Sequence, residues 1–514
     1  MLKKNPPKAP RQTTTKKQPP NARMTAIKII NRILKDGAYS NLVLNEMLPE
    51  AGLSDLDRRF VTELVYGTVK TLGTLDWILE HFVSRPLASL EPETRNILRL
   101  GVYQIYFLDR VPVSAAVNES VNLAKHFGHP GIVKFVNAVL RSSVRQKATL
   151  DWPEQAKAPL QHLALTAYHP EWLLRRWEQE FGLADTEKLC AFDNAPAPLT
   201  LRANTLVTTR EELLEKLTAD GFTAQASTWS PDGIVCTKIP SLKALFNKYY
   251  NGFYIQDESS MLAGRVLNPK PGSTVIDMCS APGGKTTHMA VLMENRGQVR
   301  ACDIYPHKLD LIKANAARLG LKNVYTFLQD GTQVRETWVG KADYVLVDAP
   351  CSGLGVLNRR AEARWTRTEA DLAAFPPLQL QILETAVQYA KPAGQILYST
   401  CTLEPAENHG LVARFLAAHP DWHLAGFKHP LTGETVTELQ LLPQRDGVDG
   451  FYLALLARTA QAAENIKATD TAAAETAKAT EAAASETTKA TDTAASETTK
   501  ATDTAAPETA GAAE

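Results

Sequence analysis

Cysteine and aspartate residues recur in the second half of the sequence at places where short runs of β-branched residues end. Asp348 is followed by Ala-Pro-Cys351, and a later run ends in Ser-Thr-Cys401. A cysteine thiolate is a strong nucleophile that can form a covalent intermediate, and a carboxylate can accept hydrogen bonds from a ligand. The spacing therefore indicates a site in which a thiol attacks a bound molecule, although a buried cysteine is often only a small apolar residue.

A glycine-rich turn follows the first of these runs, which ends at Asp277. Its two glycines let the backbone approach a ligand closely, and the helix that follows offers free N–H groups to a carboxylate. The spacing matches neither G-x-G-x-x-G nor a P-loop, so the turn alone is a weak signal. The residues that we expect to line the ligand here are Cys279, Ser280, Ala281, Pro282, Gly283, Gly284 and Lys285.

Two further aspartates narrow the class of ligand. Asp303 ends the next run, about twenty residues beyond the glycines, where a carboxylate can accept hydrogen bonds from ribose hydroxyls. Asp330 ends the third run and is placed for an adenine amino group. Each aspartate could instead stop a strand or cap a helix. Together they predict a nucleoside that carries an amino-acid carboxylate, which is S-adenosylmethionine.

Thiols beside a methyl donor suit one reaction in particular. Carbon 5 of cytosine is too weakly nucleophilic to take a sulfonium methyl group unaided, whereas thiolate addition at carbon 6 makes carbon 5 enamine-like. Asp348 could hydrogen-bond ring nitrogen 3 if it holds or shares a proton, and Cys351 is placed to assist the final elimination. Chemistry alone does not decide whether Cys351 or Cys401 attacks.

A doubly wound, Rossmann-like α/β fold must position these residues. From Gly272 onward, short strand signals alternate with amphipathic helices, which is typical of a parallel sheet covered on both faces. Ligands of such sheets bind beyond the carboxyl ends of the strands, where the cysteines and aspartates lie. The fourth and fifth strands are usually neighbours, so we expect Cys351 and Cys401 to face one pocket.

Helical periodicity dominates the region before this sheet. Apolar residues recur three and four positions apart between Thr25 and Val144, which predicts an all-α domain. Within it, the segment AVNESVNLAKHFGHPGIVKFVNAVLR resembles the helical RNA-binding fold of the antitermination factor NusB. The segment EWLLRRWEQEF predicts a helix that packs between domains, and a small α+β module follows it.

Composition marks off both ends of the chain. The start is basic and Pro-rich, and the end repeats near-copies of KATDTAASETT, so we expect both ends to be disordered. The predicted units are a basic tail (1–23), a NusB-like RNA-binding domain (24–147), a helical linker (148–195), a small α+β RNA-binding module (196–262), an S-adenosylmethionine-dependent methyltransferase domain (263–459) and a low-complexity tail (460–514).

Net charge and the positions of the cysteines restrict the kinds of binding site that the sequence can form. Lys+Arg and Asp+Glu both total 56 among 514 residues, so any nucleic-acid surface must be local. The six cysteines form no C-x-x-C pair, which favours reduced thiols in a cytoplasmic protein and predicts no metal site. No apolar run reaches about 18 residues, so we expect no membrane span. We also expect a monomer.

Three segments carry a family resemblance: DMCSAPGGKT, DAPCSGLGV and YSTCTLEPAEN look like the signature motifs of the NOL1/NOP2/Sun RNA cytosine-5 methyltransferases. The resemblance spans about Thr25 to Arg458 and implies a small-subunit (16S) rRNA substrate, met before the ribosome is fully assembled. It implies that Cys401 is the nucleophile, Cys351 releases the product and Asp348 contacts the base. The S-adenosylmethionine site that it implies comprises Cys279 to Lys285, Asp303, Asp330 and Asp348.

The chain departs from the family pattern at three places. Ser280 stands where Ala is frequent, Leu354 where Thr is common, and Ala361-Glu362-Ala363 where His-Pro-Asp is typical. The last departure could alter how this loop meets RNA.

Other functions stay open from the sequence. They are a non-catalytic RNA-binding ribosome-assembly factor, a cytosine-5 methyltransferase of another RNA such as tRNA, and methylation of DNA or protein. The intact thiol pair argues against the first. The NusB-like domain favours RNA over DNA or protein, and the Asn/Asp-Pro-Pro-aromatic signature of amino methyltransferases is absent.

Overall fold

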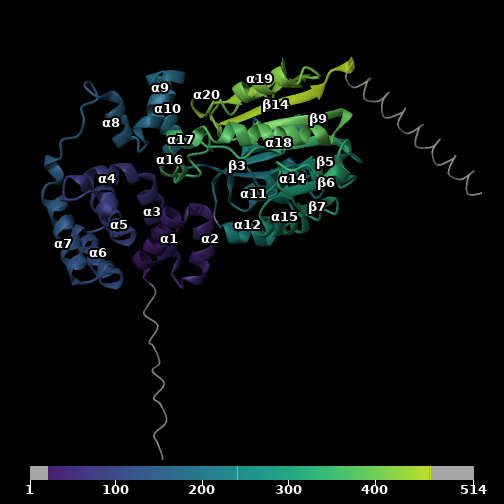
Figure 1. The fold of residues 1–514 in the computed structure, drawn as a ribbon. Helices are drawn as coiled ribbons and strands as arrows, with labels where there is room; N and C mark the ends of the chain where they lie inside the picture. The colour runs from purple at the N-terminus through teal and green to yellow at the C-terminus, as the bar shows by residue number, and fades with distance from the viewer. Residues whose placement is uncertain (1–20, 240, 462–463, 465–514) are drawn as a thin grey trace, which may run out of the picture.

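The computed structural model describes residues 21–239, 241–461 and 464, and Figure 1 shows how they are arranged. The basic start up to residue 20 and the repeats from residue 465, for which we predict disorder, lie outside the described residues. An N-terminal bundle of helices lies beside a large α/β domain, and a helical linker joins the two (Figure 1). The predicted multidomain architecture is confirmed.

The N-terminal domain is a bundle of helices that share one apolar core. Three- and four-residue spacing places residues such as Ile27 and Ile30 on the buried face of the first helix. Side-chain caps fix helix starts, as where Ser54 accepts from the backbone N–H of Asp57. The helices are α1 (Ala22–Asp36), α2 (Ser40–Glu50), α3 (Asp55–Lys70), α4 (Leu72–Glu80), α5 (Pro92–Phe107), α6 (Val113–Phe127) and α7 (Pro130–Arg145).

The linker helices pack between the bundle and the α/β domain, as predicted for EWLLRRWEQEF. Trp177 shares a buried apolar cluster with Leu354 and Leu357 of the α/β domain. The neighbouring Arg176 donates to the Glu404 carboxylate at 2.5 Å. The linker helices are α8 (Pro159–Thr166), α9 (Glu171–Phe181) and α10 (Leu183–Asn194).

The α+β module contains an antiparallel sheet in the order β2-β3-β1-β4. Alternation along β1 turns Leu201 and Ala203 into the apolar core of the module and Arg202 to the opposite face. There Arg202 donates to the carbonyl of Gly284 and the hydroxyl of Thr287 in the next domain. The elements are β1 (Leu199–Ala203), α11 (Arg210–Ala219), β2 (Thr223–Ala226), β3 (Gly233–Lys238), α12 (Leu242–Tyr249) and β4 (Phe253–Ile255).

The α/β domain is built on a sheet in the order β10-β14-β9-β8-β5-β6-β7, with β13 paired to β14. Strands β5 to β9 are parallel to one another, and β14 runs antiparallel to its neighbours β9 and β10. The chain runs from β5 outward to β6 and β7 and then returns to β8, so the switch point lies beside β5. The strands are β5 (Thr274–Asp277), β6 (Gln298–Asp303), β7 (Val324–Leu328), β8 (Ala342–Asp348), β9 (Ala390–Thr400), β10 (Trp422–Leu424), β13 (Glu438–Leu441) and β14 (Phe451–Arg458).

Helices cover both faces of this sheet, and each face has its own buried apolar cluster. Helix α13 crosses the predicted boundary at residues 262 and 263 and contacts α14, β9 and β14. The short strands β11 (Phe427–Lys428) and β12 (Thr435–Val436) pair separately. The helices are α13 (Glu258–Leu267), α14 (Gly284–Leu292), α15 (Pro306–Arg318), α16 (Ala363–Thr366), α17 (Glu369–Leu372), α18 (Phe375–Tyr389), α19 (His409–Ala418) and α20 (Pro443–Asp446).

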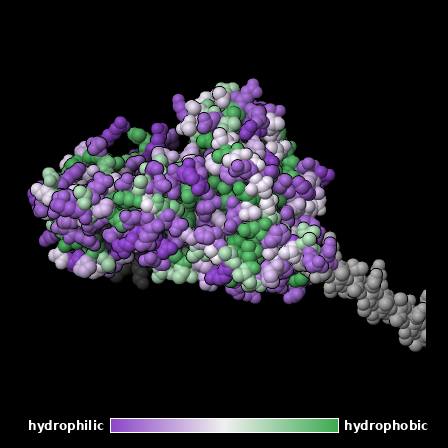
Figure 2. All heavy atoms as spheres, turned by 90° about the horizontal axis from the view of Figure 1, so that it is seen from above, coloured by the Kyte–Doolittle hydropathy of each residue, from purple (hydrophilic) through white to green (hydrophobic). Residues whose placement is uncertain are grey.

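The surface is mainly polar over the N-terminal helices, as the hydrophilic colouring at the left of Figure 2 shows. Among the described residues, none of the helices combines the length and the apolar character needed to cross a membrane.

Candidate active site

Two cysteine thiols meet at the carboxyl ends of neighbouring strands. Cys351 follows β8 and Cys401 follows β9, and the register pairs Asp348 with Ser399 just before them. The two sulfur atoms lie 3.4 Å apart, and both residues are partly exposed. The structure thus brings together the two thiols that the sequence predicts in one pocket.

Buried polar residues of the YSTCTLEPAEN segment hold the two thiol-bearing loops in place. The Glu407 carboxylate accepts from the backbone N–H of Ser352 at 3.0 Å. The Asn408 side chain accepts from the Thr400 hydroxyl at 2.5 Å and donates to the carbonyl of Thr402 at 3.0 Å. These buried hydrogen bonds fix both loops, which limits the motion of the two sulfur atoms relative to each other.

The charges around the pair favour a thiolate on Cys401. A hydrogen bond with Cys351 lowers the pKa of Cys401, and Arg360 and Lys285 lower it further against the opposing effects of burial and of Asp348. The pKa of Cys351 is raised by the same hydrogen bond, by burial and by the nearby Glu407. Since the thiolate is the nucleophilic form, these two directions favour Cys401 over Cys351 as the predicted nucleophile.

Arg360 is a residue of this site that the sequence reasoning missed. The backbone N–H of Gly355 donates to the carbonyl of Cys401 at 3.0 Å, and a helical turn from Val356 then leads to Arg360. The exposed guanidinium of Arg360 stacks on the ring of Tyr39 at 4.9 Å. The Arg-Arg pair shortly after DAPCSGLGV was the only hint of this residue in the sequence. The sequence could not show that Arg360 contacts Tyr39, because Tyr39 lies in the N-terminal domain.

The departure at Ala361-Glu362-Ala363 contacts the N-terminal domain. Glu362 is 5% exposed, and its carboxylate accepts from the Ser40 hydroxyl at 2.7 Å and from the Ser40 N–H at 3.2 Å. Nearby, the Trp365 indole donates to the carbonyl of Lys70 at 3.3 Å. The segment that we expected to affect RNA binding therefore joins the helical bundle to the thiol pocket.

Lys285 and Asp348 form an ion pair between the glycine-rich turn and the thiols. The Lys285 ammonium lies 2.9 Å from one Asp348 oxygen, and the Ser399 hydroxyl donates to the other at 3.0 Å. Burial lowers the pKa of Lys285, but Asp348 outweighs burial and leaves the pKa raised. Lys285, expected at the cofactor, thus points to Asp348 and stays charged.

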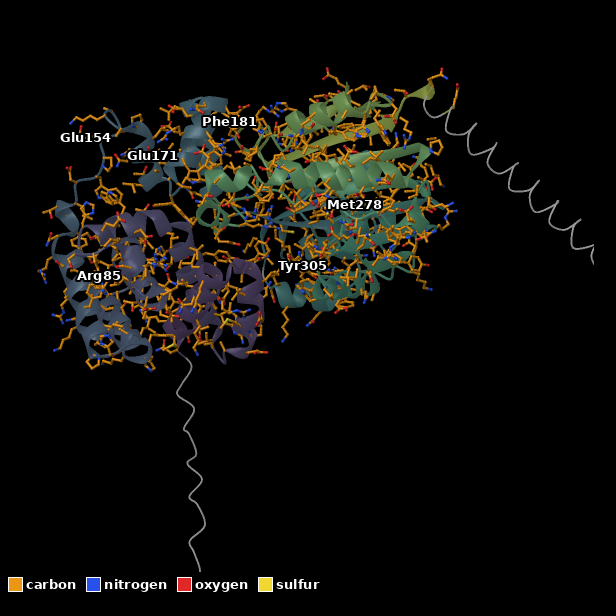
Figure 3. All side chains as sticks on the ribbon, viewed as in Figure 1. Arg85, Glu154, Glu171, Phe181, Met278 and Tyr305 are labelled. Carbon is orange, nitrogen blue, oxygen red and sulfur yellow. The ribbon has the colours of Figure 1, made fainter. Side chains whose placement is uncertain are left out.

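The glycine-rich turn places free backbone groups at the end of β5. Gly283 has φ +102°, and a Cβ there would lie 3.3 Å from the Ile312 backbone, so only glycine fits easily. Helix α14 begins at the next residue, which directs its unpaired N–H groups to this edge. The preceding Met278 is buried inside the α/β domain (Figure 3), where its N–H donates to the carbonyl of Leu346.

Hydrogen bonds and apolar packing hold the other residues of the turn. The Ser280 hydroxyl donates to the carbonyl of Asp277, and the carbonyl of Pro282 accepts from Asn315 at 3.0 Å. Ala281 packs on the apolar cluster under α15. Burial raises the pKa of Cys279 well above its usual range, which disfavours a thiolate at this position.

Asp277 lies under the turn. It is 1% exposed, one carboxylate oxygen accepts from Thr286 at 2.7 Å, and the other has no hydrogen-bond partner among the described residues. Burial raises the pKa of Asp277 to about 7.

Asp303 and Asp330 lie along the same edge of the sheet. Asp303 ends β6 and accepts from the N–H of Tyr305 at 3.0 Å. Asp330 lies two residues beyond the end of β7, not within the strand, and is exposed. One Asp330 oxygen accepts from the N–H and hydroxyl of Thr332, which bends the chain there. The carboxylates and the α14 N-terminus thus surround the switch point beside β5.

Comparisons with known families cover most of the described chain. Residues 264–457 match the family described as 16S rRNA methyltransferase RsmB/F. Residues 20–145 match the NusB family, and residues 169–242 match a ferredoxin-like domain of RsmF/B-like methyltransferases. The three matches follow the order of the helical bundle, the α+β module and the α/β domain.

Individual relatives agree with these family matches. The chain is 37% identical to the probable ribosomal RNA small subunit methyltransferase B of Bacillus subtilis, over 85% of this chain and 99% of that protein. The crystal structure of PH0851 has a TM-score of 0.77 at 28% identity and covers 86% of this chain and 99% of its own. NSun6 from Pyrococcus horikoshii with SFG has a TM-score of 0.51 at 25% identity, over 56% and 98% of the respective chains.

Proposed function

The chain belongs to the 16S rRNA methyltransferase RsmB/F family, and we propose that it methylates carbon 5 of a cytosine in small-subunit rRNA from S-adenosylmethionine through a covalent cysteine adduct. The observation that carries this proposal is the pair of thiols 3.4 Å apart, with surrounding charges that favour the thiolate of Cys401. Cytosine-5 chemistry needs one sulfur to add to the ring and later to leave, and a pair of thiols can serve both steps.

The residues at the carboxyl edge fit the methyl donor. The N–H groups at the start of α14 suit its amino-acid carboxylate, and Asp303 has a carboxylate at the end of β6 for ribose hydroxyls. Asp330, at the neighbouring strand end, is exposed and can accept from an adenine amino group. When bound, S-adenosylmethionine supplies an electrophilic methyl group. The ammonium of Lys285 is directed to Asp348, so we assign Lys285 to the base side of the pocket.

The first step is addition of the Cys401 thiolate to the pyrimidine ring. A bond forms between the sulfur and carbon 6, and the electron pair of the carbon 5–carbon 6 double bond shifts into the ring, toward carbon 5 and nitrogen 3. Asp348 and Lys285 form a hydrogen-bonded ion pair next to the thiols. This pair shares a proton that can be directed to nitrogen 3 as negative charge develops there.

Product release reverses the addition. After carbon 5 has gained the methyl group, a water molecule at the pocket accepts its proton, the C–H electron pair forms the carbon 5–carbon 6 double bond again, and the sulfur–carbon 6 bond breaks with its electron pair on Cys401. The departing sulfur becomes a thiolate, and Cys351 can donate its S–H to that thiolate across 3.4 Å. The hydrogen bond with Cys401 and burial raise the pKa of Cys351, and the nearby Glu407 adds to this effect, which suits a donor.

The direct test is methyl transfer from radiolabelled S-adenosylmethionine to unmodified small-subunit rRNA, followed by mapping of the modified nucleotide. We expect 5-methylcytosine at one position. A parallel reaction with unmodified tRNA tests whether tRNA is the substrate instead. Label in tRNA alone would reject the rRNA proposal. Binding of rRNA without any label would favour a non-catalytic assembly factor.

A further inference from the structure

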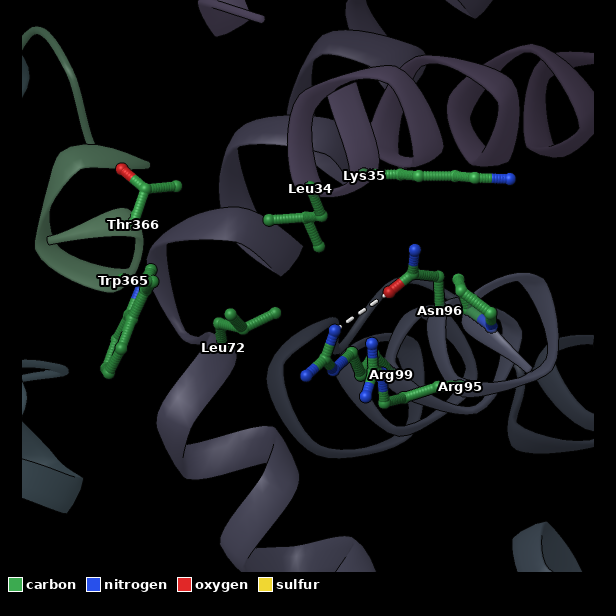
Figure 4. A pocket seen from close by; sticks show the side chains of 9 residues that line it. Leu34, Lys35, Leu72, Arg95, Asn96, Arg99, Trp365 and Thr366 are labelled. Carbon is green, nitrogen blue, oxygen red and sulfur yellow. Dashed lines mark hydrogen bonds between the residues drawn. The ribbon is translucent and has the colours of Figure 1, made fainter. Parts of the chain in front are cut away.

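A basic cavity lies where the helical bundle meets the segment after Arg360. It has a volume of about 230 Å³ and lies between α1, α4 and α5 on one side and Trp365 and Thr366 on the other (Figure 4). Lys35, Arg95 and Arg99 provide its positive charges (Figure 4). None of these three residues belongs to the predicted thiol or cofactor site.

Two of the three cations are already paired. Arg99 donates to both oxygens of Asp76, at 2.7 and 2.5 Å, and is almost fully buried. Lys35 contacts Glu93 at 3.4 Å. The carboxylates at the cavity are therefore engaged, and their charges balance those of Arg99 and Lys35.

Arg95 is the third cation of the cavity, and no carboxylate among the described residues forms an ion pair with it. Within the described part of the chain, its guanidinium makes no hydrogen bond or ion pair, and its Nε atom is buried without an acceptor. Burial and the neighbouring Arg99 lower the pKa of Arg95, and together they outweigh the opposing effect of Asp76. Arg95 as a whole is half-buried, so its Nε is shielded from water while the rest of the guanidinium can still bind an acceptor from outside the protein.

The wall next to Arg95 adds to the positive potential. Pro92 lines the cavity and begins the sixteen-residue helix α5, so the positive end of the helix dipole lies there. Pro92 has no N–H, so the N–H groups without a partner within the helix are those of Glu93 and Thr94, and Glu93 also places a carboxylate in this first turn. A guanidinium fork beside a helix N-terminus is suited to a tetrahedral oxyanion.

We propose that this cavity binds a backbone phosphate of the substrate RNA, with Arg95 as its main ligand, next to the nucleotide that enters the thiol pocket. The inference rests on the proposed function for the nature of the polyanion. The path between the two sites is short along the chain, because Trp365 and Thr366 follow Arg360 on one segment. Tyr39, which stacks on Arg360, likewise follows Lys35 of the cavity wall closely.

The test measures RNA affinity as a function of salt, using an in vitro transcribed small-subunit rRNA fragment and no methyl donor. For Arg95→Gln we expect about three- to tenfold weaker binding and a log–log salt slope smaller by about one phosphate contact. Arg95→Lys keeps the charge and should keep most of the slope. Arg145→Gln, at the exposed end of α7, is the matched control and should change the slope little.

Three outcomes would overturn the proposal. One is an unchanged slope in Arg95→Gln, and another is an equal change in Arg145→Gln. The third is stabilisation of the wild-type protein by inorganic phosphate in a thermal-shift assay while the RNA slope is unaffected, which would make the cavity a site for a free anion. Failure of methyl transfer in the wild type would reject the proposed function instead, since the binding assay does not depend on turnover.

Discussion

Cys401, which follows β9, differs from the cysteines in the cores of the α+β module and the linker. Cys236 of β3 is 1% exposed among apolar side chains, and burial raises its pKa to about 11. Burial also raises the pKa of Cys190 in α10. Cys401 is surrounded by a thiol donor and by cations, and its pKa is lowered instead. Charged and hydrogen-bonding partners, rather than burial, distinguish a reactive thiol from a structural one.

The largest expected effect comes from removing either thiol of the strand-end pair. Cys401→Ala should lower turnover by at least about a thousandfold, because no other thiolate is placed to add to the ring. Cys351→Ala should instead accumulate a covalent RNA–protein adduct that survives denaturing electrophoresis. The assignment of roles would be reversed if the adduct formed in Cys401→Ala and was missing in Cys351→Ala.

Alkylation should distinguish the two kinds of cysteine without any RNA. At neutral pH we expect iodoacetamide to modify Cys401 at least about tenfold faster than Cys236, because only thiolate reacts and Cys236 is buried and protonated. Mass spectrometry of tryptic peptides over time gives both rates in one sample. Equal rates for the two peptides in the folded protein would contradict the difference in environment.

Removing the guanidinium next to the pair should have a smaller effect. Arg360→Gln takes away a charge that lowers the pKa of Cys401, so the pKa should rise and less thiolate should be present at neutral pH. We expect turnover about three- to tenfold lower at pH 7. Turnover of this variant should return toward the wild-type level as the pH is raised through the new pKa of Cys401.

The pH–rate profile separates this electrostatic role from a structural one. Arg360→Lys keeps the charge and should keep the wild-type profile, while losing the planar stacking on Tyr39. A loss of turnover in Arg360→Gln that is the same at every pH would show that Arg360 does not act through the thiolate.

The smallest effect is expected at a structural cysteine. Cys236→Ala removes a buried sulfur from the apolar core of the α+β module and should lower the free energy of unfolding by about 1–2 kcal/mol. Turnover below the melting temperature should stay at the wild-type level. Chemical denaturation gives the stability change, and a strong loss of activity in this variant would mean that the core thiol is not merely structural.

The strand ends and their order were predictable because the signals are local. Alternating strand and helix patterns indicated parallel strands that end at Asp277, Asp303 and Asp348, and each of these strands ends there. Asp330 was placed at a strand end, but β7 stops at Leu328, since side-chain hydrogen bonds to Thr332 turn the chain. Strand ends depend on such turn contacts, which periodicity does not reveal.

The contacts between domains could not be predicted in the same way. Glu362 and Ser40 are 322 residues apart in the sequence, yet they form a buried hydrogen bond next to the thiol pocket. Neither residue type nor local pattern identifies such a pair. The same holds for Tyr39 and Arg360, and for the unpaired Arg95 in the cavity beside them.

The amino-acid sequence was sufficient for the domain order, the doubly wound sheet and the presence of two thiols in one pocket, because periodicity and strand order are properties of short segments. It could not assign the thiolate to Cys401 except through family resemblance. The structure supports that prediction first through the hydrogen bond between the two thiols and then through the charges of Arg360 and Lys285, which different segments bring to Cys401. Because a pKa responds to distances through space, only the tertiary structure could bring these groups together around the sulfur atoms.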